Sequence, residues 1–318
     1  MESLQRASAP SGCSRREALR MVTAAAAAAI LDGPKLTTTP AASPRTRPIP
    51  SSGELLPVVG LGTWQTFDVG ASAADRAPLE ATLGLFVRRG GRLVDSSPMY
   101  GRSESVVGEI AGKLGISATL FFATKVWTTG RDAGIEQMER SLRAFGAPRI
   151  DLEQVHNLVD VETHLPTLRA WKDAGKIRYL GITHYDAGAY SEVESLLRRE
   201  KLDFLQINYS VAEPESGRRL LPLAAERGVA VVANRPFGGG GLLRKASGRP
   251  LPDCAEALGC KSWAPLFLKW ILADEAVTCV IPGTGRPEHL EENLAAGSGR
   301  LPDPAERRAI ERAAEAFA

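Results

Sequence analysis

The chain has 318 residues, which is enough for one large barrel or for two domains of ordinary size. Hydrophobic residues make up 44% of the sequence and charged residues 24%, as in soluble globular proteins with a substantial core. The 39 basic and 37 acidic residues leave a formal net charge of +2, so composition gives no electrostatic argument for nucleic acid or another polyanion as a partner.

Residues 1–48 differ in composition from the rest of the chain. Arg15 and Arg16 precede an alanine-rich apolar stretch of about 11 residues, which is too short to span a bilayer, since a spanning helix needs about 20. The segment 14–20 (SRREALR) resembles a twin-arginine export signal, although Ala18 stands where a bulkier apolar residue is usual. Small residues at 41–43 suit cleavage, and five prolines between positions 34 and 50 indicate a linker.

We therefore predict that residues 1–48 are a twin-arginine-like signal peptide and a proline-rich linker. The signal implies export of the folded protein to the periplasm by the twin-arginine machinery. The alternative is a disordered or helical extension on a cytoplasmic protein.

From residue 49 onward, short apolar runs rich in β-branched residues alternate with helical patterns. Strands are predicted at residues 58–61, 92–95, 120–125, 152–155, 179–183, 204–207, 229–233 and 278–281. Helices are predicted at residues 81–89, 104–114, 133–145, 165–174, 190–199, 220–227, 264–272, 287–294 and 305–317. Strands that alternate with helices imply a parallel sheet with crossover helices. Eight such units predict an α/β fold, a single (β/α)₈ barrel over residues 49–318.

An open, doubly wound sheet is the alternative fold. It requires a G-x-G-x-x-G turn after the first strand, with a helix that opens directly from it. Residues 60–65 (GLGTWQ) contain only the first two glycines, and no helical pattern begins there. The closed barrel is therefore favoured.

Four ionisable residues stand at or just after the ends of predicted strands, where a barrel of this kind carries its catalytic groups. Asp95 ends the second strand, and Tyr100 follows five residues later. Lys125 ends the third strand and His156 follows the fourth. Neighbouring strands lie about 5 Å apart, so these side chains can converge.

This set of side chains suits the reduction of a carbonyl group, because hydride attack creates an alkoxide that needs a proton. A free tyrosine, with a pKa of about 10, is a weak acid at neutral pH. We expect the Lys125 cation to lower the pKa of Tyr100, and Asp95 to hold that lysine charged and in place. A neutral His156 would hydrogen-bond to the substrate oxygen or to the tyrosine hydroxyl.

With these residues the sequence resembles the aldo-keto reductase superfamily. Its members carry an aspartate four or five residues before a Tyr-Gly pair, a lysine that closes strand three and a histidine that closes strand four. The similarity runs from residues 58–64 (VVGLGTW) to residues 281–284 (IPGT) and the Glu292-Asn293 pair. It implies an oxidoreductase that reduces an aldehyde or ketone with hydride from a nicotinamide cofactor and a proton from Tyr100.

Two other functions fit the same resemblance. One is a nicotinamide-binding regulatory subunit without significant turnover, and the other is an exported dehydrogenase or epimerase-like protein that retains its cofactor. The presence of all four catalytic positions favours an enzyme over the regulatory subunit. Cofactor retained through gel filtration would favour the dehydrogenase or epimerase-like protein.

The resemblance also implies residues that hold the nicotinamide and the pyrophosphate. Gln206 matches the carboxamide-binding position on strand six, whereas Thr183 and His184 replace the usual Ser-Asn pair after strand five. After strand seven, Asn234 replaces the usual stacking aromatic residue, and Arg235 brings a cation toward the pyrophosphate. The glycine run that begins at Gly238 can expose backbone N–H groups to that phosphate.

The segment after strand eight is expected to hold the adenosine end of the cofactor. Glu292 and Asn293 match the adenine-binding positions of the family. NADP-preferring relatives often carry Lys and Arg where this chain has Gly283 and His289, but Thr284, Arg286 and the start of the next helix remain available for a 2′-phosphate. We expect NADP(H) to be favoured and NAD(H) to be possible, with a small-molecule carbonyl substrate whose identity the resemblance does not assign.

The four cysteines are too few for a disulfide framework, and none forms a Cys-x-x-Cys pair, so we expect no metal site. Cys254 and Cys260 could pair in an oxidising compartment, although two buried thiols are favoured. We expect the protein to be a monomer.

Overall fold

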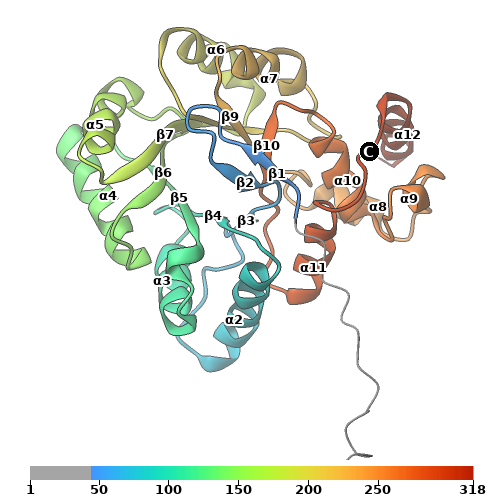
Figure 1. The fold of residues 1–318 in the computed structure, drawn as a ribbon, viewed down its shortest axis with the longest axis horizontal. Coiled ribbons are helices and arrows are strands. Elements are labelled where there is room, and N and C mark those ends of the chain that lie inside the picture. Colours follow the sequence, from blue (N-terminus) through green and yellow to red (C-terminus); the bar gives the residue numbers. More distant parts are fainter. Residues whose placement is uncertain (1–43, 318) are drawn as a thin grey trace, which may run out of the picture. The chain divides into compact units, whose positions relative to one another are not determined.

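The computed structural model describes residues 44–317, so the predicted signal peptide and Cys13 lie outside the described residues. Eight parallel strands form one curled sheet, in which each strand pairs with its neighbours in the sequence (Figure 1). They are β3 (Leu61–Gly62), β4 (Leu93–Asp95), β5 (Phe121–Val126), β6 (Ile150–His156), β7 (Ile177–Thr183), β8 (Phe204–Asn208), β9 (Ala230–Asn234) and β10 (Val277–Val280). Each overlaps one predicted strand, and the predicted (β/α)₈ fold is confirmed.

Hydrogen bonds between the two ends of the sheet close it into a barrel. The Gly60 N–H donates to the Val280 carbonyl at 2.9 Å, and the Val280 N–H donates to the Val58 carbonyl at the same distance. The Gly62 N–H donates to the Pro282 carbonyl at 3.1 Å. A Cβ on Gly62 would lie 3.0 Å from the Ile281 carbonyl oxygen, so glycine allows these backbones to approach.

Helices surround the barrel and connect its strands (Figure 1). They are α2 (Ala73–Arg88), α3 (Ser103–Leu114), α4 (Arg131–Phe145), α5 (Val161–Asp173), α6 (Tyr190–Arg199), α7 (Ser216–Glu226), α10 (Trp263–Leu272), α11 (Pro287–Ala295) and α12 (Pro304–Glu315). The first of them begins earlier than predicted, because the Ser72 hydroxyl accepts a hydrogen bond from the Asp75 N–H and caps it. Two further short helices, α8 (Gly241–Ala246) and α9 (Cys254–Ala257), were not predicted.

The apolar core has two layers because strand side chains alternate between the two faces of the sheet. Inside the barrel, Phe121, Tyr179 and Phe204 pack with ring centroids 5.5–6.2 Å apart. A larger cluster fills the space between the outer face of the sheet and the helices. The filled interior leaves the carboxyl ends of the strands as the place for a site.

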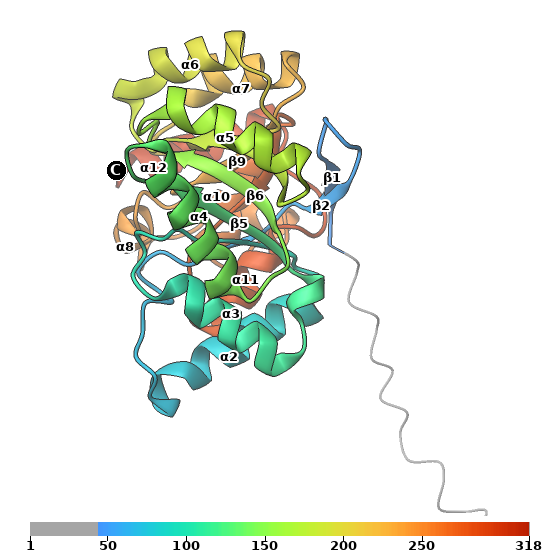
Figure 2. The same cartoon turned by 90° about the vertical axis from the view of Figure 1, so that its left-hand side faces the viewer.

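A hairpin lies at the end of the barrel opposite α8 (Figure 2). Its strands β1 (Thr46–Pro48) and β2 (Leu55–Pro57) pair in antiparallel fashion. Ile49 and Leu56 are fully buried among the residues of the barrel interior. The folded part of the chain therefore includes residues 46–48, which the sequence analysis assigned to the linker.

Arg47 fastens this hairpin to the barrel. Its guanidinium donates to the carbonyl of Leu272 at 2.6 Å and to that of Asp274 at 2.8 Å, just before β10. The Leu272 carbonyl is the last of α10 and that of Asp274 lies just beyond it, and carbonyls at a helix end need donors. The polar contact explains why a proline-flanked segment with little apolar periodicity is ordered.

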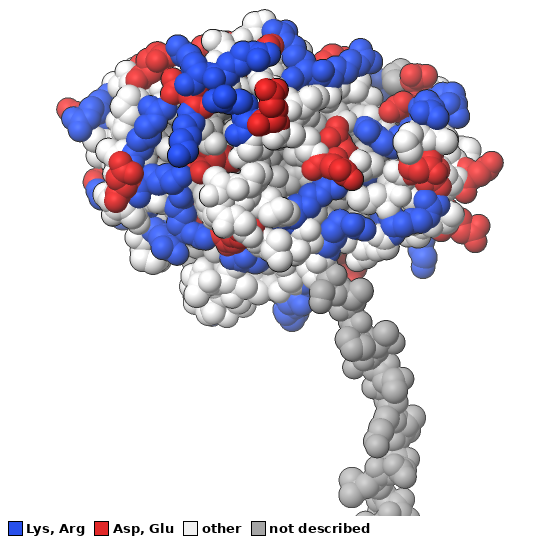
Figure 3. Space-filling model, turned by 45° about the horizontal axis from the view of Figure 1, so that its top comes forward, with Lys and Arg blue, Asp and Glu red and all other residues white. Residues whose placement is uncertain are grey.

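Acidic and basic side chains are interspersed over the face seen in Figure 3. Several of them pair, among them Arg198 with Glu194 at 2.8 Å. Within residues 44–317 no helix is both long and apolar enough to cross a membrane. Cys254, Cys260 and Cys279 are free thiols in the structure.

Two glycines of α3 provide a test of the helix packing. A Cβ added at Gly108 would overlap the backbone of Ala144 and Phe145 in α4, whereas one added at Gly112 would meet nothing within 4 Å. We expect Gly108→Ala to lower the free energy of unfolding by about 1–3 kcal/mol through overpacking. Gly112→Ala should leave it unchanged or raise it by up to about 1 kcal/mol, because alanine favours the helix.

Urea-induced unfolding of the two variants measures this difference. Equal stabilities would contradict the close contact of α3 with α4.

Candidate active site

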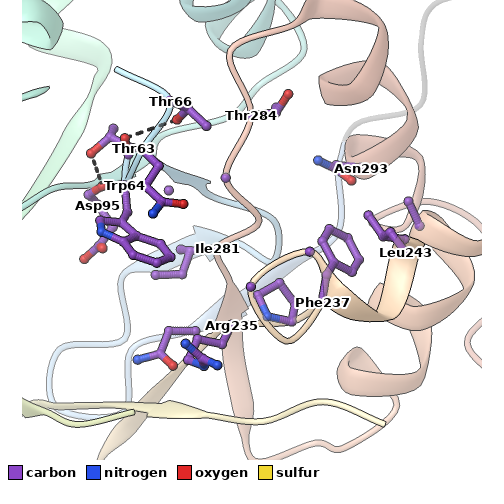
Figure 4. Close-up of a pocket in the computed structure, with 18 of the residues that line it drawn as sticks. Thr63, Trp64, Thr66, Asp95, Arg235, Phe237, Leu243, Ile281, Thr284 and Asn293 are labelled. Atoms are coloured by element: carbon purple, nitrogen blue, oxygen red, sulfur yellow. Dashed lines mark hydrogen bonds between the residues drawn. The ribbon is translucent and has the colours of Figure 1, made fainter. Parts of the chain in front are cut away.

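A cavity of about 1180 Å³ opens at the carboxyl ends of the strands, and all four predicted catalytic residues line it. Its size lies slightly above the roughly 300–1,000 Å³ that small-molecule sites usually have. Figure 4 shows that Trp64 and Asp95 lie toward one end and Leu243 and Asn293 toward the other, with Ile281 between them. The cavity is therefore long enough to hold an extended ligand beside the catalytic residues.

Lys125 and Asp95 form a buried ion pair at the floor of the cavity. The Lys125 Nζ donates to the two carboxylate oxygens of Asp95 at 2.8 and 2.9 Å and to the Ser96 carbonyl at 2.6 Å. Burial by itself would lower the pKa of Lys125, but the charges of Asp95 and its neighbours outweigh it, and the pKa is raised. The lysine is therefore held as a cation with all three of its N–H donors satisfied.

Tyr100 stands next to this cation. The Lys125 Nζ lies 5.1 Å from the centre of the Tyr100 ring. Burial raises the pKa of Tyr100 above its usual value, and the positive charge of Lys125 only opposes that rise. The lysine lowers the pKa of the tyrosine as expected, but desolvation is the larger effect, so the net pKa lies above the usual value. The tyrosine keeps its proton at neutral pH, as a proton donor must.

His156 completes the catalytic end of the cavity. Its ring stands edge-on to Tyr100, with centroids 6.1 Å apart, and its Nδ1 lies 3.2 Å from the Ser97 hydroxyl. Burial and, to a lesser degree, the nearby Lys125 cation lower the pKa of His156 to about 3. The imidazole is therefore neutral at physiological pH, as the sequence analysis expected.

Four predicted cofactor-binding residues lie on or just after neighbouring strands beside this end. Thr183 and His184 at the end of β7, Gln206 on β8 and Asn234 on β9 all line the cavity. The Gln206 Nε2 donates to Asp95 at 3.3 Å, and its Oε1 is buried without a partner among the described residues. The Asn234 Nδ2 likewise donates to the His184 carbonyl at 3.1 Å and leaves Oδ1 without a partner.

These free acceptors are a test of whether a nicotinamide fits. A carboxamide brings an NH₂ group with two donors, and buried acceptors need donors. The Gln206 Oε1 and the Asn234 Oδ1 are two such acceptors, and they come from adjacent strands. The residues present therefore fit a nicotinamide ring.

Arg235 follows β9 and lines the cavity. Its backbone adopts φ of 49°, a left-handed conformation that non-glycine residues rarely occupy. Its guanidinium lies 5.5 Å from the centre of the Tyr185 ring and 3.7 Å from a Glu213 carboxylate oxygen. A strained backbone that presents a cation to a cavity is consistent with a role in anion binding.

The glycine run differs from the prediction. Gly238 does not line the cavity, and its N–H donates to the Arg235 carbonyl at 2.9 Å. The Gly240 N–H donates to the Phe237 carbonyl at 3.0 Å, so both groups close tight turns and are not presented to a phosphate. Gly239 and Gly240 line the cavity, and both have the positive φ that glycine permits.

The segment after β10 contributes several residues to the lining of the cavity. Gly283, Thr284, Glu292 and Asn293 line it, as does His289, but Arg286 does not. Instead, Arg286 is the N-cap residue of α11, and its N–H donates to the Thr284 hydroxyl at 3.1 Å. Most residues predicted for the adenosine end are therefore in place, without the guanidinium of Arg286.

Comparison with known proteins places these features in a family. Residues 58–314 match the family model described as the aldo/keto reductase family. The chain belongs to the aldo/keto reductase family. Methylglyoxal reductase YeaE of Escherichia coli is 28% identical over 253 residues, which are 77% of this chain and 87% of that protein.

A second E. coli relative, a NADH-specific methylglyoxal reductase, is 25% identical over 314 residues, with 80% of this chain and 94% of that protein covered. Among solved structures, an aldo-keto reductase from Klebsiella pneumoniae in complex with NADPH is similar, with a TM-score of 0.72 and 25% identity. That match covers 85% of this chain and 94% of the other. This aldo/keto reductase is therefore an oxidoreductase of the (β/α)₈ class.

Several residues that line the cavity of this aldo/keto reductase were not predicted. They include the exposed aromatic residues Trp64, Trp127 and Tyr185 near the catalytic end, together with Arg249, Lys261 and Trp263. Trp64 directly follows the first strand and could have been inferred from its position alone. Arg249 and Lys261 lie between β9 and α10, far from any strand end, and no pattern in the sequence marks them.

The buried ion pair has a direct consequence for stability. Lys125→Met leaves the Asp95 carboxylate buried with Gln206 as its remaining side-chain partner, so we expect the free energy of unfolding to fall by about 3–5 kcal/mol. Adding Asp95→Asn removes the stranded charge and should recover part of that loss.

Denaturant unfolding of the single and the double variant measures the difference. A double variant less stable than Lys125→Met would show that Asp95 is not stranded by loss of the lysine.

Proposed function

We propose that this protein reduces an aldehyde or ketone to an alcohol with NAD(P)H, with NADP(H) as the favoured cofactor. The observation that carries the proposal is the Lys125 cation, which is fixed by Asp95 beside a protonated Tyr100 and a neutral His156 in one cavity. The NADPH complex of the Klebsiella relative supports NADP(H). The NADH-specific E. coli relative keeps NAD(H) possible.

When bound, the reduced nicotinamide supplies the hydride. Tyr100 donates its phenolic proton to the carbonyl oxygen as negative charge develops there. Lys125 stabilises the phenolate that remains, and Asp95 keeps the lysine in position. His156, being neutral, contributes a hydrogen bond to the same oxygen and carries no competing charge.

The cofactor would be held along the cavity by residues of four segments. Gln206 and Asn234 offer free oxygens to the carboxamide, with Thr183 and His184 beside them. Arg235 offers a cation to the pyrophosphate. Asn293 lies toward the far end of the cavity (Figure 4), where the adenosine would bind, and Glu292, the residue before it, also lines the cavity. Arg249 and Lys261 add two cations to the lining of the cavity, and they could balance the negative charge of a 2′-phosphate.

We propose a small carbonyl compound as the substrate. Trp64, Trp127 and Tyr185 are 42–48% exposed and line the cavity, so they offer apolar surface to such a molecule. The relatives named as methylglyoxal reductases support a small α-dicarbonyl compound as the first one to test.

We expect Tyr100→Phe to lower kcat by at least about 10²-fold, since a positioned acid typically contributes about 10²–10⁴-fold to the rate. NADPH binding should be unchanged, because only the acidic hydroxyl is lost. NADPH oxidation with methylglyoxal and other aldehydes measures turnover, and quenching of tryptophan fluorescence measures binding.

Tyr190→Phe is the matched control, since the Tyr190 hydroxyl donates to Asn208 at 2.9 Å and does not line the cavity. Ordinary turnover in Tyr100→Phe would exclude Tyr100 as the proton donor. A wild-type protein that binds NADPH but reduces no carbonyl would support the regulatory alternative.

We also propose that the N-terminal segment ahead of β1 directs export to the periplasm by the twin-arginine route. The Arg15-Arg16 pair, the alanine-rich stretch and the small residues at 41–43 support this proposal. Cleavage at 41–43 would leave β1 intact, because that strand begins at Thr46. A barrel that crosses the membrane folded could acquire its cofactor before export.

The double variant Arg15→Lys, Arg16→Lys should accumulate uncleaved in the cytoplasm, whereas the wild type should appear cleaved in the periplasm. Cell fractionation and immunoblotting measure both, and Arg6→Lys serves as a control outside the arginine pair. Equal retention of wild type and double variant in the cytoplasm would refute export.

A further inference from the structure

Ser97 contacts both Tyr100 and His156, the two residues proposed to bind the carbonyl oxygen of the substrate. It is fully buried, and it opens the turn of residues 97–100, in which the Tyr100 N–H donates to the Ser97 carbonyl at 2.9 Å. Its side-chain hydroxyl lies 3.2 Å from the Nδ1 of His156. One residue therefore contacts the backbone of Tyr100 and the imidazole of His156.

The direction of the hydrogen bond between Ser97 and His156 follows from the available donors. A neutral imidazole carries one N–H, on either Nδ1 or Nε2, and a serine hydroxyl carries one hydrogen. The Met99 N–H already points at the Ser97 oxygen, at 3.4 Å. If Nδ1 also carried hydrogen, two donors would face that oxygen, and the hydroxyl hydrogen would have no acceptor among residues 44–317.

The opposite arrangement satisfies every group. The Ser97 hydroxyl accepts from Met99 and donates to the lone pair of Nδ1, so the hydrogen of the imidazole resides on Nε2. An unsatisfied buried donor costs free energy, which favours this arrangement. The imidazole makes its one side-chain hydrogen bond within residues 44–317 through Nδ1, so Nε2 is left for a ligand, and His156 lines the cavity.

We propose that Ser97 is a positioning residue that fixes His156 as the Nε2–H tautomer, with this N–H directed at the substrate oxygen. The role of this N–H in catalysis rests on the proposed carbonyl reduction. The tautomer can be tested independently of that function. Through the same turn Ser97 places Tyr100, so the tyrosine O–H and the histidine N–H are oriented together toward one oxygen.

Nitrogen NMR of protein labelled with ¹⁵N-histidine tests the tautomer directly. The chain has four histidines, and comparison with His156→Gln identifies the His156 signals. At neutral pH the wild type should show a pyrrole-type Nε2 and a pyridine-type Nδ1. A pyrrole-type Nδ1 of His156 in the wild type would overturn the proposal, whatever the activity.

Variants then test the role of the hydroxyl. Ser97→Ala should give a mixture of the two tautomers and lower kcat by about 10-fold or more, as loss of a group that orients a histidine typically does, with little change in KM. Ser97→Thr keeps the hydroxyl and should restore the wild-type tautomer. Ser141→Ala removes an equally buried hydroxyl, which donates to Glu104 away from the cavity, and should alter neither spectrum nor kcat.

A Ser97→Ala variant with an unchanged tautomer and an unchanged kcat would show that the serine does not set the imidazole. Loss of carbonyl reduction in the wild type, with the Nε2–H tautomer present, would count against the proposed function alone.

Discussion

A lysine cation inside a barrel is the constraint on which this site depends. The side chain of Lys125 is 1% exposed, and an uncompensated charge at that depth costs several kcal/mol. Asp95 and the Ser96 carbonyl satisfy all three of its donors. The pairing of the strands makes this possible, because Asp95 on β4 lies opposite Ala123 on β5, and Lys125 projects from the same face two residues later.

The same cation acts on both of the other catalytic groups. Burial raises the pKa of Tyr100 and Lys125 opposes that rise, whereas burial and Lys125 together lower the pKa of His156. One fixed charge therefore makes the tyrosine a better acid than its burial alone would allow, and it adds to the burial that keeps the histidine neutral. The two groups can then face one substrate oxygen as a proton donor and a neutral hydrogen-bond donor.

Much of this arrangement could be predicted from the sequence, because it depends on position along strands. A polar residue at the end of an apolar strand is at the carboxyl face of any parallel barrel, which is why Asp95, Lys125 and His156 were found. The β1 strand was missed because its order comes from contacts distant in sequence, such as Arg47 with Leu272.

Other features depend on the fold itself. The Gly238 N–H is used within a tight turn, a pairing that a run of glycines does not reveal. Arg249 and Lys261 reach the cavity from a connection with no strand to mark them. The direction in which the pKa of Tyr100 shifts depends on how deeply the side chain is buried, which the residue types do not specify.

The buried charge of Lys125 lowers the pKa of Tyr100 relative to the value that burial alone would give. Titration of ¹³C-tyrosine signals by NMR, in wild type and in folded Lys125→Met, measures it most directly. The pKa of Tyr100 should rise when the lysine is replaced, while that of Tyr190, whose charged neighbours are Glu213 and Glu215, should stay the same. An unchanged or lower pKa of Tyr100 in the variant would contradict the account.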